Sequence, residues 1–349
     1  MNRESIEGVI VGTAVGDALG LAYEGLSPAR AQVLLGPPDR YRFLFGRGMV
    51  SDDTEHTCLV ALALCASAGD PGEFEKQLAR GLRYWLLGLP AGVGWATLRA
   101  GIRLWLGYSP ARSGVYSAGN GPAMRSAVIG AATRDLQRLA ALVRSATRIT
   151  HTDERAYVGA LAVALAARQS AAGGCDGHLL LNELGRLAET DPGEMHERLA
   201  DAVSSAGSSE GLDEFLVRNG HGKGVSGYVV DSVAVAIRIW LAYPDDIEQA
   251  LIRAVSCGGD SDTLAAIVGG IVGARCGAAG IPARWRDGLR EWPRSVTWMR
   301  KLGCELADVS HSSQPSRRLR YRHLASLPRN LLFLLMVVAH VLRRLLPPY

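Results

Sequence analysis

The feature that constrains this chain most is the segment CGGDSDT at residues 257–263, which stands directly before a buried helix. Two carboxylates and two hydroxyls fall within four residues, and the spacing of the apolar residues at 264, 267, 268 and 271 is that of a helix with one buried face. Asp260 or Ser261 can cap this helix, which places both carboxylates at its dipole-positive N-terminus. The glycines at 269, 270 and 273 predict that another helix packs tightly against it.

A second, similar arrangement lies about 200 residues earlier, where the SDDT segment at 51–54 precedes an apolar run at 58–64. Taken alone, each segment is explained by an ordinary acidic N-cap. Two such caps on two buried helices can also meet head to head. Four carboxylates within ~4 Å of one another would then repel by several kcal/mol at an effective dielectric of about 20. Bound cations relieve this repulsion, so a centre with two divalent cations is the simplest interpretation.

Five motifs in the chain carry a family resemblance. They are GDALG at 16–20 with Glu24 after it, SDDT at 51–54, SAGNGPAMR at 117–125, HTDERAYVGA at 151–160, and GGDSDTLAAIVGGIVGA at 258–274. In this order they resemble the ADP-ribosylglycohydrolase family, the relatives of dinitrogenase-reductase-activating glycohydrolase, from residue 6 to about residue 298. The resemblance implies an all-α fold, a compact multi-helix orthogonal bundle. Because no sustained period-2 alternation occurs, the residues themselves also favour a single, nearly all-α domain.

The resemblance implies a set of metal-binding and catalytic residues. Oxygen-only ligands favour hard cations, so we expect two divalent ions, Mg²⁺ or Mn²⁺. By sequence alone Glu24 is a solvated loop acid, but it matches the family's key glutamate and is the expected catalytic residue together with Asp53. It could act as general acid or as general base. The expected metal ligands are Ser51 (where relatives often carry Thr), Asp52, Asp53, Asp260, Asp262 and Thr263.

Two further positions bear on the chemistry. Asp17, inside the first buried helix, is expected to serve as a hydrogen-bonding residue rather than a catalytic one, because a buried carboxylate needs partners. Gly92 stands where many relatives carry Asp. This departure puts in doubt any mechanism that uses an acid at that position.

The substrate contacts are expected on glycine-rich segments. Residues 117–125 should open a helix with Pro122 in its first turn, and backbone N–H groups at such a start can hold a phosphate. The resemblance implies that this segment cradles the diphosphate and nearby ribose of ADP-ribose. Tyr116 would stack on adenine or belong to the core, His151 would contact the ligand or cap the next helix, and Tyr228 would line the pocket or pack in the core. The expected substrate-binding residues are Gly94, Trp95, Tyr116, Ser117, Gly119, Asn120, Gly121, Met124, His151 and Tyr228.

Charge is distributed unevenly along the chain. The net charge is +4, but no acid follows Asp308, whereas seven arginines do. Without that tail, 31 basic residues stand against 34 acidic ones, so the body lacks the basic character of a nucleic-acid binder. We therefore divide the chain into a catalytic domain at 1–308 and an arginine-rich, apolar tail at 309–349.

The tail contains an apolar run at 331–342, interrupted only by His340. A membrane-spanning helix needs about 20 apolar residues, so this run is not expected to span. It would cover an apolar patch on the body or on a partner protein, lie on an anionic membrane surface, or remain largely disordered. The family resemblance does not extend to it.

The activity that the resemblance implies is hydrolysis of the bond between ADP-ribose and a protein side chain, commonly arginine. The partner would be an ADP-ribosylated protein or ADP-ribose. The alternatives are a catalytically silent ADP-ribose-binding module, or a hydrolase of another ADP-ribose-linked acceptor such as serine, nucleic acid or a small molecule. Six cysteines without paired spacing and the lack of a signal-peptide pattern predict a cytoplasmic protein, with peripheral membrane association through the tail as an option.

Overall fold

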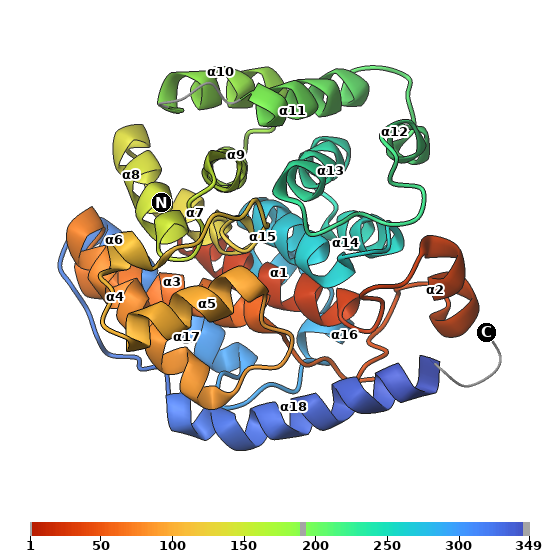
Figure 1. The fold of residues 1–349 in the computed structure, drawn as a ribbon. Helices are drawn as coiled ribbons and strands as arrows, with labels where there is room; N and C mark the ends of the chain where they lie inside the picture. Colours follow the sequence, from red (N-terminus) through yellow and green to blue (C-terminus); the bar gives the residue numbers. More distant parts are fainter. Residues whose placement is uncertain (1, 189–192, 345–349) are drawn as a thin grey trace.

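The computed structural model describes residues 2–188 and 193–344, and within these ranges it is built of helices without a strand (Figure 1). The predicted all-α fold is therefore confirmed. The first helices are α1 (Arg3–Gly20), α2 (Pro28–Leu35), α3 (Asp52–Ser67), α4 (Pro71–Trp85), the 3₁₀ turn η1 (Leu86–Gly88), α5 (Trp95–Trp105), α6 (Pro110–Ser113), the 3₁₀ turn η2 (Ala123–Arg125), α7 (Ala127–Ala132), α8 (Leu136–Arg148) and α9 (Glu154–Ala171). They are followed by α10 (Gly177–Leu187), α11 (Gly193–Ala206), α12 (Leu212–Arg218), α13 (Val229–Ala242), α14 (Ile247–Ser256), α15 (Ser261–Gly280), α16 (Ala283–Arg286), α17 (Val296–Ser312) and α18 (His323–Arg344).

The antiparallel pair α1 and α15 forms the centre of the molecule (Figure 1). Their backbones touch along a seam of small residues. A Cβ atom added to Gly12 would stand 2.2 Å from the carbonyl oxygen of Gly269, and one added to Gly20 would stand 2.4 Å from that of Ser261. Only glycine allows this approach. The tight packing predicted from the α15 glycines is thus confirmed, and it brings the C-terminal end of α1 against the N-terminal end of α15.

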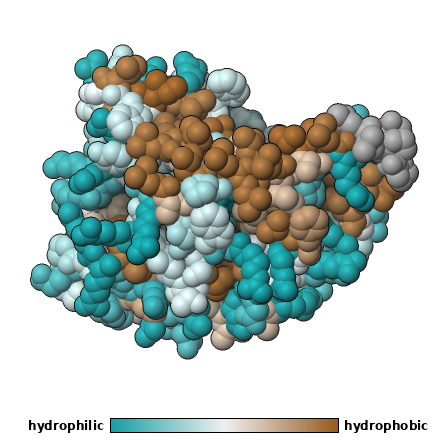
Figure 2. All heavy atoms as spheres, turned by 90° about the horizontal axis from the view of Figure 1, so that it is seen from below, coloured by the Kyte–Doolittle hydropathy of each residue, from teal (hydrophilic) through white to brown (hydrophobic). Residues whose placement is uncertain are grey.

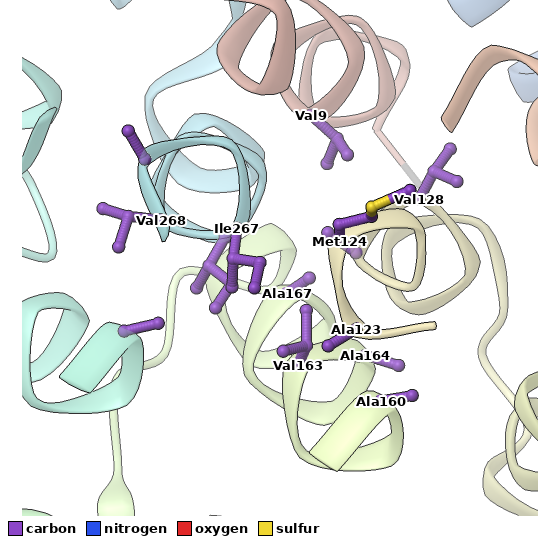
Figure 3. Close-up of a cluster of buried hydrophobic side chains, with 14 of the residues drawn as sticks. Val9, Ala123, Met124, Val128, Ala160, Val163, Ala164, Ala167, Ile267 and Val268 are labelled. Atoms are coloured by element: carbon purple, nitrogen blue, oxygen red, sulfur yellow. The ribbon is translucent and has the colours of Figure 1, made fainter. Parts of the chain in front are cut away.

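The core continues from this pair to α9 and to the segment η2–α7. Figure 3 shows Val9 of α1, Met124 of η2, Val163 of α9 and Ile267 of α15 pointing into one cluster. The helices approach closely because many residues on α9 are alanine and because Gly130 of α7 lies against its backbone. This packing fixes the segment before η2 relative to α15.

Asp17 connects α1 to the start of α3. Its carboxylate accepts hydrogen bonds from the backbone N–H of Ser51 at 2.9 Å, the backbone N–H of Thr54 at 3.2 Å and the hydroxyl of Thr54 at 2.5 Å. The predicted structural role of Asp17 is therefore confirmed. By holding the first turn of α3, it places Ser51, Asp52 and Asp53 beside the α1–α15 pair.

The tail lies along the underside of the body in the view of Figure 1, as α18. The predicted domain boundary after residue 308 falls inside α17, which continues to Ser312. By length and composition, two helices of the described ranges could cross a membrane. One is α15, most of which is buried in the core, and the other is α18, most of which is exposed. Residues 345–349 of the predicted tail lie outside the described ranges.

Candidate active site

The two acidic segments meet at the end of the α1–α15 pair. The Thr263 hydroxyl donates a hydrogen bond to Oδ2 of Asp53 at 3.3 Å, and the Ser51 hydroxyl donates to the same oxygen at 3.0 Å. Across the site, the Asn120 amide donates to Oδ2 of Asp260 at 2.7 Å. Three distant parts of the sequence, the starts of α3 and α15 and the loop before η2, are therefore in direct contact.

Only one of the two helix starts, that of α3, has a side-chain N-cap. Ser51 is the N-cap of α3 and its hydroxyl accepts the N–H of Asp53. Asp260 occupies the N-cap position of α15, but its side chain accepts no hydrogen bond from that helix. Its carboxylate accepts from Asn120 instead. A simple capping role thus accounts for Ser51 but not for the acid before α15.

A cavity of about 330 Å³ opens at this junction. Glu24 lies on its wall, and Asp53 lies just behind the wall with 1% of its surface exposed. The other predicted metal ligands line the cavity: Ser51, Asp52, Asp260, Asp262 and Thr263. Eight predicted substrate contacts also line it: Gly94, Trp95, Ser117, Gly119, Asn120, Gly121, Met124 and His151. Their roles in binding and catalysis remain predictions.

Two predicted substrate contacts do not line this cavity. The Tyr116 side chain is on the surface, with 79% exposed. The Tyr228 hydroxyl accepts a hydrogen bond from Arg155 at 2.9 Å and donates one to Glu194 at 2.6 Å. The core was the alternative expectation for both tyrosines. Tyr116 does not belong to it, whereas the half-buried Tyr228 packs against it. Contact between either ring and a ligand in this cavity would require the side chain to move.

The carboxyl groups are held in an unfavourable electrostatic environment. Burial raises the pKa of Asp52, Asp53 and Asp262 well above the usual value, and neighbouring acids raise it further, with Asp17 acting on the first two and Glu24 on Asp262. The pKa of Glu24 is also raised, first by the surrounding protein and then by Asp260. Carboxylates raise one another's pKa in this way when no positive charge lies close enough to balance them.

Two carboxylate oxygens in this cluster are buried without a hydrogen-bond partner, Oδ1 of Asp53 and Oδ1 of Asp262. Orphaned buried acceptors are rare in folded proteins and call for a missing partner, such as a water or an ion. In the described ranges, however, no three His, Cys, Asp or Glu side chains are already arranged as a metal-binding group. The carboxylates instead accept hydrogen bonds from Ser51, Asn120 and Thr263.

The two remaining motifs differ in part from expectation. Residues 123–125 form a 3₁₀ turn rather than the start of an α-helix, because α7 begins only at Ala127. The cap of α9 is Asp153, which accepts the N–H of Arg155, so His151 is not the capping residue. Burial, assisted by the neighbouring Arg125, lowers the pKa of His151 to about 3, and its ring is therefore neutral at the cavity wall.

Several cavity residues were not predicted. Six of them lie within three residues of a predicted contact, so extending each predicted segment by three residues would have included them: Leu21, Ala91, Gly92, Ala96, Thr97 and Gly227. Phe333 and Val337 come from α18 and close the cavity from the side of the tail. No family motif reaches these two residues, and only the apolar run at 331–342 indicated that this part of the tail packs against something.

Comparison with known proteins places most of the chain in one family. The family profile described as ADP-ribosylglycohydrolase matches residues 2–316, which includes every acidic residue of the cavity. The chain belongs to the ADP-ribosylglycohydrolase family. Its members are hydrolases that remove ADP-ribose, and the family match ends before α18. Phe333 and Val337, the two cavity residues of α18, therefore lie outside the family profile.

Individual relatives cover most of the chain. A protein of Archaeoglobus fulgidus is 33% identical over 297 residues, which are 83% of this chain and 92% of that protein. The ADP-ribosylarginine hydrolase Tri1 of Pseudomonas putida is 28% identical over 322 residues, which are 86% of this chain and 77% of that protein. A solved structure described as an ADP-ribosylglycohydrolase-related protein complex is 28% identical, with a TM-score of 0.64, covering 88% of this chain and 98% of its own.

Proposed function

We propose that this ADP-ribosylglycohydrolase uses two divalent cations, Mg²⁺ or Mn²⁺, to release ADP-ribose from a modified protein, with ADP-ribosylarginine as the acceptor linkage. The observation that carries the proposal is the convergence of Glu24, Asp52, Asp260 and Asp262 on one cavity with a glycine-rich wall. The arginine linkage is supported by the name of the Tri1 relative, an ADP-ribosylarginine hydrolase.

The residues of the cavity fit a pair of hard cations. All candidate ligands offer oxygen, which suits Mg²⁺ and Mn²⁺ better than zinc. The unpartnered oxygens of Asp53 and Asp262 would each gain a partner, and the acids that now raise one another's pKa would gain counter-charge. Because the acids now accept protein hydrogen bonds, binding would exchange some of those bonds for metal ligation.

The charge of the cavity also argues for bound cations. Four carboxylates line it, and among the described residues no Lys or Arg side chain does. A cavity of this sign repels the diphosphate of ADP-ribose. Two bound divalent cations would balance the four carboxylate charges, orient a water molecule and lower its pKa.

Glu24 is the candidate for proton transfer. Its side chain is exposed to the cavity, and its raised pKa brings it closer to neutral pH, where a general acid or base works best. The neutral ring of His151 and the amide of Asn120 would contact the sugar or phosphate without adding charge. An oxocarbenium-like state at C1″ would then form beside Glu24.

The test is release of ADP-ribose from a panel of modified acceptors that includes arginine-linked and serine-linked protein, each with Mg²⁺, Mn²⁺ or EDTA. The proposal predicts release from the arginine-linked substrate with metal and none with EDTA. Glu24→Gln should abolish release but keep ADP-ribose binding, whereas Asp287→Asn, at an exposed carboxylate on the surface, should change neither. Binding of ADP-ribose by the wild type without release from any acceptor would favour a silent binding module instead. Release from serine alone would reassign the acceptor.

We place this activity in the cytoplasm. Three of the six cysteines, Cys58, Cys65 and Cys257, are buried, and all six are unpaired in the structure. Burial raises the pKa of Cys58 and of Cys257 to about 12, so neither is a reactive thiolate. Fractionation of cells that express the tagged chain tests the location, and recovery in a secreted fraction would contradict it.

A further inference from the structure

The helix α18 has an inverted polarity. A surface helix normally buries its apolar face and exposes its polar face. In α18 the buried residues include Ser326, Arg329 and Asn330, each about 2% exposed. His340 and Arg344 also face the body, where they contact the backbone oxygens of Phe43 at 2.7 Å and of Glu24 at 2.8 Å.

The opposite face of α18 is apolar and open. Its side chains recur at three- and four-residue intervals, which is the spacing of one helix face. The exposed apolar residues are Leu324, Leu331, Leu332, Leu334, Leu335, Val338, Val341 and Leu342, with 40% to 77% of their surface exposed. Figure 2, which views the molecule from below, shows a continuous hydrophobic band across this face.

The band extends onto η1 and α5. The peptide oxygen of Gly88 in η1 accepts a hydrogen bond from Asn330 at 2.8 Å, which places the η1 region against α18. Trp95 of α5 lines the same cavity as Val337 of α18. The two elements and the residues directly after them contribute five exposed apolar side chains, Leu87, Leu89, Trp95, Trp105 and Leu106. We call these five, together with the exposed apolar residues of α18, the apolar band. An apolar surface of this extent on a soluble protein marks an interaction site.

Cations flank the apolar band at both ends of α18. The exposed Arg343 stands at its C-terminal end, and Arg318, Arg320 and Arg322 directly precede its N-terminal end. These three line a hollow of about 610 Å³ with Lys301, and in the described part of the chain no carboxylate lines it. No acid follows Asp308 in the sequence, and Arg318 lies 3.7 Å from the Asp308 carboxylate.

We propose that the apolar band is the docking surface for an anionic phospholipid bilayer, with α18 lying in the plane of the membrane. Apolar side chains would enter the boundary between headgroups and acyl chains, and the flanking arginines would contact the anionic headgroups. Docking in this orientation sets the active-site cavity beside the membrane, since Trp95 and Val337 belong to its wall.

The structure disfavours the other occupants of this face. A spanning α18 would have to withdraw Arg329 from its buried pair with Glu291, 2.7 Å away, and carry that charge into lipid. A second copy of the chain would bring arginines against arginines, because both ends of the band carry them. The negative charge of an anionic membrane complements the arginines at both ends of the apolar band.

The test is cosedimentation of the full chain with phosphatidylcholine vesicles, with and without phosphatidylglycerol. We expect binding to the anionic vesicles and at least tenfold weaker binding to the zwitterionic ones. Leu335→Glu/Val338→Glu should weaken binding by about a hundredfold, because two side chains that enter the bilayer become charged. Arg320→Ser/Arg322→Ser should weaken binding to anionic vesicles by about tenfold and reduce its salt dependence.

Val217→Glu is the matched control, because Val217 is 70% exposed on α12, away from the apolar band (Figure 1). It should bind vesicles as the wild type does. All variants should keep the wild-type melting temperature and ADP-ribose release from a soluble substrate. The proposal is overturned if anionic vesicles do not bind, if Val217→Glu weakens binding as much as the band variant, or if bound protein survives alkaline carbonate extraction as a spanning helix does. A dimer in light scattering that Leu335→Glu/Val338→Glu dissociates would assign the face to a second copy instead.

Discussion

Asp262→Asn should make the metal-free protein more stable, although it removes a residue proposed to be essential. Burial raises the pKa of Asp262, four neighbouring acids (Glu24, Asp260, Asp53 and Asp17) raise it further, and its Oδ1 atom has no hydrogen-bond partner. A carboxylate roughly 5 Å away repels another by about 3 kcal/mol at an effective dielectric near 20. The neutral amide removes this repulsion and can donate a hydrogen bond to a neighbouring acid. We therefore expect the free energy of unfolding to rise by about 2–4 kcal/mol near pH 8.

The pH dependence has a definite sign. A carboxyl whose pKa is raised in the folded state binds more protons there than in the unfolded chain, so its ionisation lowers stability as pH rises from about 4 toward the folded pKa. The advantage of Asp262→Asn should therefore be larger near pH 8 than near pH 6. The neutral histidines, such as His151, act in the opposite direction only below their unfolded pKa of about 6.5.

The assay is thermal unfolding of the wild type and Asp262→Asn in EDTA and in excess Mn²⁺, at the two pH values. In EDTA the variant should melt several degrees higher, and in Mn²⁺ the order should reverse, because only the wild type gains from the ion. Asp17→Asn is the control, since Asp17 accepts hydrogen bonds from Ser51 and Thr54 and its loss should lower the melting temperature in both buffers. If Asp262→Asn were less stable than the wild type in EDTA, the account of uncompensated repulsion would be refuted.

Three further substitutions test the packing. Arg329→Met should lower the free energy of unfolding by about 3–5 kcal/mol in denaturant titration, because Glu291 would lose the two hydrogen bonds that Arg329 donates to it in the protein interior; an unchanged midpoint would show that this ion pair contributes little. Gly269→Val should lower it by more than about 3 kcal/mol, because a Cβ atom there would stand 2.2 Å from the carbonyl oxygen of Gly12; wild-type stability would mean that the seam is looser than described. Gly185→Ala, within α10 and with open space around its Cβ position, should instead raise stability by about 0.5–1 kcal/mol in the same titration, and a loss would contradict the helix assignment.

The sequence predicted the parts of the fold that local patterns determine. The apolar spacing after Asp260 and the glycines at 269 and 273 identified α15 and its close partner, because a helix seam of this kind requires small residues at regular intervals. The meeting of the two acidic segments was also predictable, because two buried helices that each begin with paired carboxylates and hydroxyls are typical of a shared cation site. Its direct evidence is the contact between Asp53 and Thr263.

Other features depend on tertiary contacts that leave no local pattern. The buried surface of α18 is largely polar, and its docking depends on Glu291, which lies far from Arg329 in the chain. The apolar run at 331–342 predicted contact with an apolar surface. The structure buries Phe333 of this run against the body but leaves most of its other apolar residues exposed. The position of Tyr116 was uncertain for a similar reason, because an aromatic residue before a glycine-rich loop gives no sign of whether it faces the core, a ligand or solvent.

The most direct test of the proposed centre is calorimetric titration of Mn²⁺ into the metal-free chain, compared with Asp52→Asn and Asp260→Asn. We predict uptake of two ions by the wild type, and weaker uptake or the loss of an ion in each variant, because the two acids come from the opposite sides of the site. Failure of the wild type to take up Mn²⁺ or Mg²⁺, or equal uptake by all three proteins, would contradict the binuclear centre and the mechanism built on it.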